Sequence, residues 1–146
     1  MLLALSPAVI VTAPAAQSAY APSAATVAAY EARILYRIND VRSRYGRVKL
    51  ASVTCPDWYA ERWAPYLGSN GYFYHQNMYT ILNGCQATRA AENLARGNVS
   101  ADTIFVAWMK SPGHAANIMD GRLTRIGVAA VYTRGQWVVV ADFTRP

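Results

Sequence analysis

Two runs of β-branched and aromatic residues near the C-terminus set the strongest constraint on the fold of this chain. They span residues 126–132 and 137–143 and flank a short stretch, Thr-Arg-Gly-Gln, that contains a glycine. Runs of this composition around a short glycine-containing connection are typical of a β-hairpin. The sequence therefore predicts antiparallel strands at this end of the domain.

The first part of the chain has a different period. Between residues 26 and 45, apolar side chains recur at helical spacing, and charged side chains lie on the other face. The apolar set is Val27, Tyr30, Ile34, Ile38, Val41 and Tyr45. Thr26 is a suitable N-cap and Gly46 a suitable end signal, so we predict a helix between them.

A second helix is predicted from about residue 55 to 67. Thr54 is a plausible cap, and Pro56 suits the first turn of a helix. Pro65 falls late in this segment and predicts a bend or an end there. Residues 68–71, Gly-Ser-Asn-Gly, then read as a loop.

The middle of the chain gives a weaker pattern. Residues 72–98 have no long period, and we expect an irregular segment with a short strand near 92–95. Ser100 can cap a helix over 101–110, where Ile104, Phe105, Trp108 and Met109 share one face. Ser111 and Pro112 resemble a cap and a first helical position, which opens a short helix ending at residue 119.

The order of these elements indicates the fold class. Helices come first, followed by a short strand, further helices and a hairpin, which predicts an α+β fold with helices packed on a small antiparallel sheet. The 146 residues, of which 53% are hydrophobic, suit one domain with a real core.

The N-terminus differs in composition from the rest. Residues 1–29 contain no charged side chain and begin with an apolar block followed by small residues. This pattern resembles a secretory signal with Ala-x-Ala cleavage options at 13–15 and 19–21. The alternative is a membrane anchor, but Pro7 and Pro14 interrupt the block. We therefore expect a signal peptide at 1–21 and one domain at 22–146, without a transmembrane segment in the mature protein.

Two cysteines agree with export. Cys55 and Cys85 are the only thiols and form no Cys-x-x-Cys motif. In an oxidising compartment they would pair into a disulfide, whereas the alternative is two buried free thiols.

The net charge of +6 comes mainly from arginines that are scattered along the chain. For an exported protein, a basic surface suits cell-envelope polymers or acidic lipid headgroups rather than nucleic acid. The same charge also serves general solubility.

Three titratable side chains stand inside apolar or aromatic sequence: His75, Glu92 and His114. Their spacing matches no local metal motif, and a lone histidine is commonly a hydrogen-bonded structural residue. With Ser111 as cap, however, His114 occupies the third helical position, where the helix dipole disfavours the charged imidazolium. Neutral imidazole is the form that binds metals and accepts protons.

These residues lie in motifs that resemble a known family. The stretches Ala-Glu-Asn-Leu-Ala at 91–95 and Ser-Pro-Gly-His-Ala-Ala-Asn-Ile at 111–118, in this order, resemble bacterial members of the CAP superfamily. That family, also called SCP, comprises the cysteine-rich secretory, antigen 5 and pathogenesis-related 1 proteins. The resemblance implies an α-β-α sandwich with an open cleft.

The resemblance also implies site residues. It places His75, Glu92 and His114 in the cleft, with Asn93 and Ser111 beside them. Ser111 stands where many members have a second cleft glutamate. Two imidazoles and one carboxylate suit a weakly bound Zn²⁺ ion whose coordination is completed by water.

Three functions fit these features. The first is a secreted, monomeric module that binds an envelope polymer, a lipid or a small molecule. The second is a metal-dependent hydrolase acting on envelope material or peptides, and the third is a purely structural envelope protein. Aromatic side chains could wall the cleft of a binding module, but we expect most of them to lie in the core. These are Trp58, Tyr59, Trp63, Tyr66, Tyr72, Phe73 and Tyr74.

Overall fold

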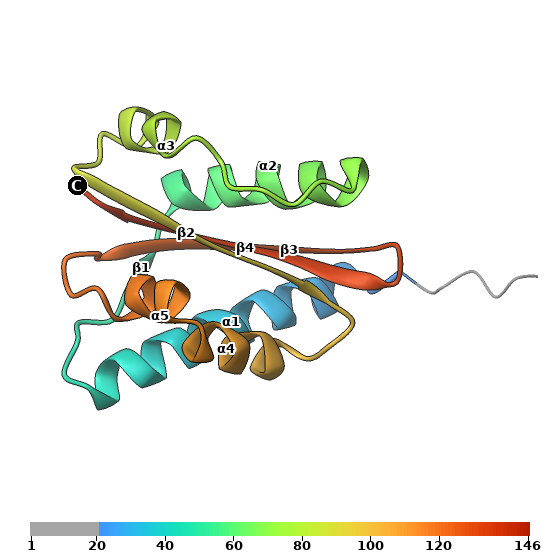
Figure 1. Ribbon diagram of the computed structural model, residues 1–146, viewed down its shortest axis with the longest axis horizontal. Coiled ribbons are helices and arrows are strands. Elements are labelled where there is room, and N and C mark those ends of the chain that lie inside the picture. Colours follow the sequence, from blue (N-terminus) through green and yellow to red (C-terminus); the bar gives the residue numbers. More distant parts are fainter. Residues whose placement is uncertain (1–20) are drawn as a thin grey trace, which may run out of the picture.

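The structure of the protein is a computed structural model, which describes residues 21–146. It is an α-β-α sandwich, in which one sheet lies between two layers of helices (Figure 1). The elements follow the chain as α1 (Ala24–Arg44), β1 (Ala51–Ser52), α2 (Thr54–Asn70), α3 (Met78–Gly84), β2 (Arg89–Gly97), α4 (Ala101–Lys110), α5 (Pro112–Met119), β3 (Arg125–Thr133) and β4 (Gln136–Arg145). The α+β class is therefore confirmed. The predicted signal peptide falls almost entirely on residues outside the described part.

The helices divide between the two faces of the sheet. Helices α2 and α3 cover one face, and α1, α4 and α5 cover the other (Figure 1). Among residues 21–146, no helix is both long and apolar enough to cross a membrane.

The sheet has four strands in the order β1-β3-β4-β2. The predicted hairpin is its centre: β3 and β4 pair antiparallel around a turn at Arg134 and Gly135. Both turn residues have positive φ, 51° and 76°. This conformation matches the twist of the flanking strands and is favoured in two-residue hairpins.

One part of the sheet prediction was wrong, because the sheet is mixed and not purely antiparallel. The short strand β1 pairs parallel to β3. At only two residues, β1 is too short to show a strand pattern in the sequence.

Strand β4 is buried on both faces, which explains its nearly continuous apolar sequence. Trp137, Val139, Ala141 and Phe143 belong to the larger core, on the side of α1 and α4. Val138 and Val140 belong to the smaller core under α2. The alternation follows from the two-residue period of a strand.

Helix α1 begins slightly earlier than predicted. Ser23, rather than Thr26, is the N-cap, and its side chain accepts a hydrogen bond from the Thr26 backbone N–H. The predicted end is confirmed, because Gly46 has a left-handed φ of 65°. Tyr45, which we expected on the apolar face, is 72% exposed because the helix has already ended at Arg44.

Helix α2 begins at Thr54 itself and runs past the predicted end near Pro65. Packing stabilises its last turn, because Leu67 and Gly68 are buried against the sheet. A Cβ at Gly68 would lie 2.7 Å from Thr133 Cγ2, so glycine permits this close approach. The predicted loop at 68–71 is therefore helical through Asn70, and Gly71, with a left-handed φ of 70°, ends the helix.

The segment expected to be irregular contains two elements. Strand β2 is longer than the predicted strand at 92–95, and the short helix α3 was not predicted. Only one residue of α3, Ile81, is buried, so the sequence of this helix shows no helical period of apolar residues.

The predicted Cys55–Cys85 disulfide is confirmed, with an S–S distance of 2.06 Å. It ties the start of α2 to the end of α3 and, by the chain-entropy argument, stabilises the fold by roughly 3–4 kcal/mol.

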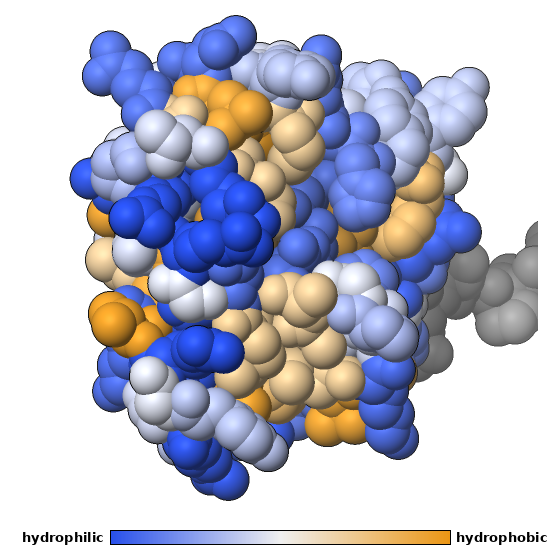
Figure 2. Space-filling model, turned by 60° about the vertical axis from the view of Figure 1, so that its left-hand side comes forward, coloured by the Kyte–Doolittle hydropathy of each residue, from blue (hydrophilic) through white to orange (hydrophobic). Residues whose placement is uncertain are grey.

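The surface in Figure 2 alternates strongly hydrophilic areas with small apolar ones, and no single apolar area covers this face. Among the described residues, Asp120 forms ion pairs with Arg89 and Arg122. This pattern is that of an ordinary solvated surface.

A buried arginine joins the C-terminal end of α1 to the loops around it. Arg42 is fully buried, and its guanidinium donates to the backbone carbonyls of Val48, Ile118, Asp120 and Leu123 at 2.8–3.0 Å. Burial lowers the pKa of Arg42 below its usual value. The four carbonyl partners offset the cost of burying this charge.

We predict that Arg42→Met lowers the free energy of unfolding by about 3 kcal/mol or more, because it leaves several buried carbonyls without a donor. Chemical denaturation monitored by circular dichroism measures the change. The control is Arg44→Met in the same helix, whose partner Asp40 forms an exposed ion pair. There we expect a change of about 0.5 kcal/mol or less. Equal losses in the two variants would contradict a structural role for Arg42.

Candidate functional site

The candidate site lies across β2, which is one of the two edge strands of the described sheet. One wall comes from the segment 71–77 between α2 and α3, and the other from α5. His75, Glu92, Ser111 and His114 all line one cleft of about 400 Å³, together with Gly113 and Asn117. One histidine thus comes from the segment between α2 and α3, and the other comes from α5.

Glu92 holds the first histidine. Its Oε1 lies 2.7 Å from His75 Nδ1 and accepts the Gln76 backbone N–H at 3.0 Å, and its Oε2 accepts from Gln76 Nε2 at 2.7 Å. The Glu92 side chain is 1% exposed and that of His75 is 59% exposed. Glu92 therefore orients the exposed ring from a buried position, with both of its oxygens engaged by protein groups.

A second buried carboxyl group lies directly opposite Glu92. Asp142 is its partner in the β2–β4 register, and Gln76 Nε2 also donates to Asp142 Oδ2 at 2.8 Å. The other oxygen, Oδ1, is buried without a hydrogen-bond partner among the described residues. Burial, and next the negative charge of Glu92, raise the pKa of Asp142 well above its usual range. The pair therefore favours a protonated Asp142 beside an engaged Glu92.

His114 is held by a different contact. Its Nδ1 lies 2.7 Å from Ser111 Oγ. Burial, and next the electrostatic effect of His75, lower the pKa of His114. The sequence argument expected the helix dipole to keep this ring neutral, and the structure adds these two causes. It also corrects the role of Ser111, which is the N-cap residue of α5 but makes no capping bond with its side chain.

Asn93 lies behind the cleft and does not line it. It is fully buried, and its Nδ2 donates to the His114 carbonyl at 3.1 Å. Asn117 Nδ2 donates to Asn93 Oδ1 at 2.9 Å and to the Glu92 carbonyl at 3.3 Å. The two amide side chains thus link α5 to β2 by hydrogen bonds and hold the helix against this strand.

Sequence reasoning missed three of these residues. Asn117 belongs to the quoted 111–118 motif, and Gln76 directly follows His75, but neither was assigned a role. Asp142 is a carboxylate inside an otherwise apolar strand, a signal that points to a buried polar contact.

The three-ligand metal set of His75, Glu92 and His114 that the resemblance implies stays a prediction. Within residues 21–146, no group of three or more His, Cys, Asp or Glu side chains is placed to hold a metal ion. Both Glu92 oxygens are engaged by protein groups. His75 and His114 are the two donors that remain in the cleft.

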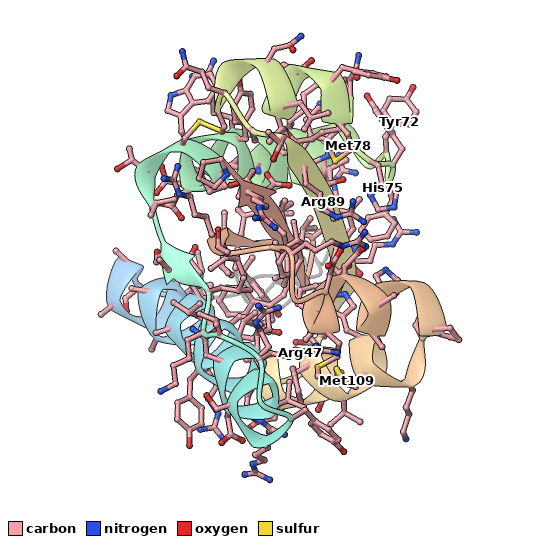
Figure 3. The ribbon with its side chains drawn as sticks, turned by 90° about the vertical axis from the view of Figure 1, so that its left-hand side faces the viewer. Arg47, Tyr72, His75, Met78, Arg89 and Met109 are labelled. Atoms are coloured by element: carbon pink, nitrogen blue, oxygen red, sulfur yellow. A yellow bond between two sulfur atoms is a disulfide. The ribbon has the colours of Figure 1, made fainter. Side chains whose placement is uncertain are left out.

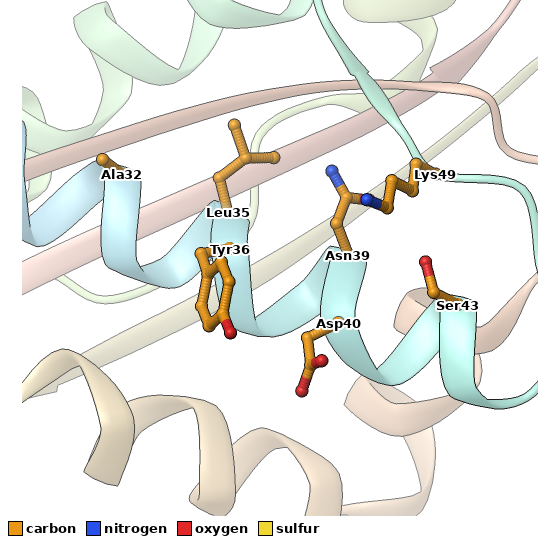
Figure 4. A pocket seen from close by; sticks show the side chains of 7 residues that line it. All are labelled: Ala32, Leu35, Tyr36, Asn39, Asp40, Ser43 and Lys49. Carbon is orange, nitrogen blue, oxygen red and sulfur yellow. The ribbon is translucent and has the colours of Figure 1, made fainter.

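Another hollow, of about 370 Å³, lies along α1 (Figure 4). Its polar residues include Asn39, Asp40 and Lys49. The Asn39 side chain is engaged with the Leu50 backbone, so this residue has a structural role. The hollow contains none of the predicted site residues.

The expectation that most aromatic residues of 58–74 lie in the core was wrong. Trp58, Tyr66, Tyr72, Phe73 and Tyr74 are 40–64% exposed. Tyr59 and Trp63 are half-buried. The core is filled instead by aliphatic side chains and by residues such as Trp108 and Phe143.

The fold and the site together define a class of α-β-α sandwich proteins with two histidines in a cleft at the sheet edge. The sequence profile of CAP, the cysteine-rich secretory protein family, matches residues 35–143, and the chain belongs to this family.

Several known proteins resemble the chain. YkwD from Bacillus subtilis, described as uncharacterized, is 29% identical over 124 residues, which cover 80% of this chain and 48% of YkwD. A structure of an extracellular SCP-domain protein from Bacillus anthracis aligns with a TM-score of 0.74 at 21% identity, over 86% of this chain and 44% of the other. This chain therefore spans about half the length of these two proteins.

Two further structures share the fold. An outer surface protein from Borrelia burgdorferi aligns with a TM-score of 0.70 at 22% identity, over 77% of this chain and 89% of that protein. The crystal structure of NaASP2 with Zn²⁺ aligns with a TM-score of 0.58 at 13% identity, over 78% of each chain.

We predict that Asp142→Asn changes the pH dependence of stability in a defined direction. A carboxyl whose pKa is raised by folding stabilises the protein below its unfolded pKa of about 4, and this contribution is lost as pH rises through the folded pKa. The wild type should therefore lose stability relative to Asp142→Asn as pH increases above about 4. Urea unfolding at a series of pH values measures the difference.

Asp120→Asn provides a control of opposite sign. Hydrogen bonding to Arg122 lowers the pKa of Asp120, so its stabilising contribution is present above about pH 4 and is lost as pH falls. A stability difference between wild type and Asp142→Asn that does not vary with pH would refute the assignment of a protonated Asp142.

Proposed function

We propose that this protein is an exported ligand-binding module whose cleft holds a divalent metal ion weakly through His75 and His114. The observation that carries the proposal is the arrangement of the two imidazoles in one cleft. Each ring has its Nδ1 engaged by a fixed protein group, Glu92 or Ser111, which leaves Nε2 as the available donor. Rings oriented in this way are typical of histidines that bind metals.

The chemistry of the donors suits Zn²⁺ or a similar ion. Imidazole is a preferred ligand of Zn²⁺, and the lowered pKa of His114 keeps that ring in the neutral, binding form. Glu92 would act behind His75 as a carboxylate that raises the basicity of the ring. A bound ion would supply an electrophilic centre for an oxygen ligand. The structure of NaASP2 with Zn²⁺ supports a metal in a protein of this fold.

An exported location fits the protein's covalent structure and its relatives. Disulfides persist in oxidising compartments, and the chain has one. Two structural relatives are described as an extracellular protein and an outer surface protein. Together with the net charge of +6, these features favour an envelope polymer as the partner of a monomeric module.

A metal-dependent hydrolase is the second candidate, and the two histidines in one open cleft are the observation that favours it. An ion held by both rings would activate a bound water as the nucleophile. Hydrolysis would require turnover of envelope material or peptides that is lost in His114→Ala and in chelator. If the protein binds its ligand but shows no turnover, the hydrolase is excluded and the binding module remains the function.

We predict that Zn²⁺ binds the wild-type protein in calorimetry at near-neutral pH and that His114→Ala abolishes this binding. Glu92→Gln should weaken it by roughly 10- to 100-fold, because the carboxylate behind a metal-binding histidine has effects of this size. Asp40→Asn, on α1, is the control and should bind as the wild type does.

The same samples test whether the metal is structural. The disulfide and the two cores hold the fold without an ion, so a chelator should shift the melting temperature little. Unfolding by the chelator, or the absence of any divalent-ion binding to the wild type, would each overturn the proposed site.

A further inference from the structure

We infer that the outer face of α2 and the segment 71–77 form a binding surface for an acidic glycan, separate from the histidine cleft. We call this surface, made of Trp63, Tyr66, Tyr72 and Tyr74, the aromatic platform. The inference rests on the proposed function only for the expectation that the partner lies outside the cell.

The platform is a connected set of rings. Trp63 and Tyr66 stack at 4.8 Å between ring centroids with an interplanar angle of 21°. Tyr74 meets both rings edge-on, and Tyr72 lies 6.3 Å from Tyr74. Bonds from Trp63 Nε1 to the Tyr74 carbonyl, and between the Tyr66 and Tyr74 hydroxyls, fix these rings. Their orientation is therefore set before any ligand arrives, which lowers the entropic cost of binding.

A purely structural role accounts for only part of this set. The bond from Trp63 to Tyr74 anchors the segment that carries His75. Tyr66 and Tyr72, however, are 41% and 64% exposed, so much of their ring area faces solvent. A shallow groove of about 480 Å³, lined by Glu61, Arg62, Trp63, Pro65 and Tyr66, runs beside the stacked pair.

The composition of the exposed surface favours a sugar over a lipid or an apolar protein partner. Every large hydrophobic side chain that is exposed between residues 58 and 74 is aromatic. The exposed aliphatic residues Val48, Val99 and Val106 lie in other parts of the chain. Rigid rings with hydroxyl groups match the apolar faces and hydroxyl edges of pyranose units, whereas acyl chains need a deeper apolar cavity.

The charges around the platform favour an acidic glycan. The Arg62 guanidinium lies over Trp58 at 4.5 Å, and that of Arg96 lies over Phe73 at 4.9 Å. Arg134 donates to the Ser69 carbonyl beside the end of α2. Glu61 is the one carboxylate among the residues that line the groove. The three cations therefore suit carboxylate or phosphate groups on a sugar chain.

The platform and the cleft share one segment of the chain. Tyr72, Tyr74 and His75 all belong to 71–77, and Tyr72 and His75 lie on the same side of the molecule (Figure 3). A chain of sugar units that covers the platform would therefore extend toward the histidine cleft.

The test uses the full chain with oligogalacturonate, a carboxylated sugar chain, and a neutral cello-oligosaccharide of equal length. Calorimetry and tryptophan fluorescence measure binding. We expect the acidic oligomer to bind more tightly, and Tyr66→Ala and Tyr72→Ala each to weaken it by roughly five- to tenfold. Arg62→Gln should weaken the acidic oligomer alone and reduce the effect of added salt.

Two controls separate this surface from the rest of the molecule. Tyr79→Ala removes a ring that is 74% exposed on α3, outside the platform, and should leave binding unchanged. His114→Ala, which should lose Zn²⁺, should keep the sugar. Equal affinity for both oligomers, or wild-type affinity in Tyr66→Ala and Tyr72→Ala, would overturn the inference. Loss of sugar binding in His114→Ala would assign the sugar to the cleft and would also overturn it.

Discussion

The register between β2 and β4 places two carboxyl groups, Glu92 and Asp142, directly opposite each other on a buried part of the sheet. Burying two adjacent negative charges away from water would cost much free energy. The Gln76 amide donates to both groups, and burial together with the charge of Glu92 raises the pKa of Asp142, which favours its protonated form. Because Gln76 is drawn to this pair, the adjacent His75 is held at the edge of β2.

A second buried polar group, the Arg42 guanidinium, lies in the layer of α1, α4 and α5. Arg42 donates to the carbonyls of Ile118 and Asp120 and so holds the C-terminal end of α5, the helix that carries His114. Asn93 holds the same helix from the side of β2. Each cleft histidine thus depends on buried hydrogen bonds and not on apolar packing alone. This dependence fits a site that needs a defined ring orientation, since directional bonds set geometry more narrowly than hydrophobic contacts do.

The segment 71–77 links the two surfaces proposed for binding. It carries Tyr72 and Tyr74 of the aromatic platform and the histidine held by Glu92. Trp63 fixes it at Tyr74, and the carboxyl pair fixes it at His75 and Gln76. The disulfide lies beyond it and holds α3 to the start of α2. A segment without regular secondary structure is therefore ordered by side-chain contacts at several points. Such an ordered loop on a rigid scaffold is a common location for binding residues.

The sequence by itself determined the elements whose signals are local. The period of α1, the caps of α4 and α5, and the hairpin of β3 and β4 could all be predicted, and the family motifs named His75, Glu92 and His114. Only the tertiary structure decided how α2 passes Pro65, where α3 forms, and that β1 pairs parallel to β3. It alone assigned both Glu92 oxygens to protein partners, identified Gln76 and Asp142, and left most of the aromatic residues of 58–74 exposed. The physical reason is that these outcomes depend on contacts between residues far apart in the chain, such as Glu92 with Asp142, whose energies have no local signature in the sequence.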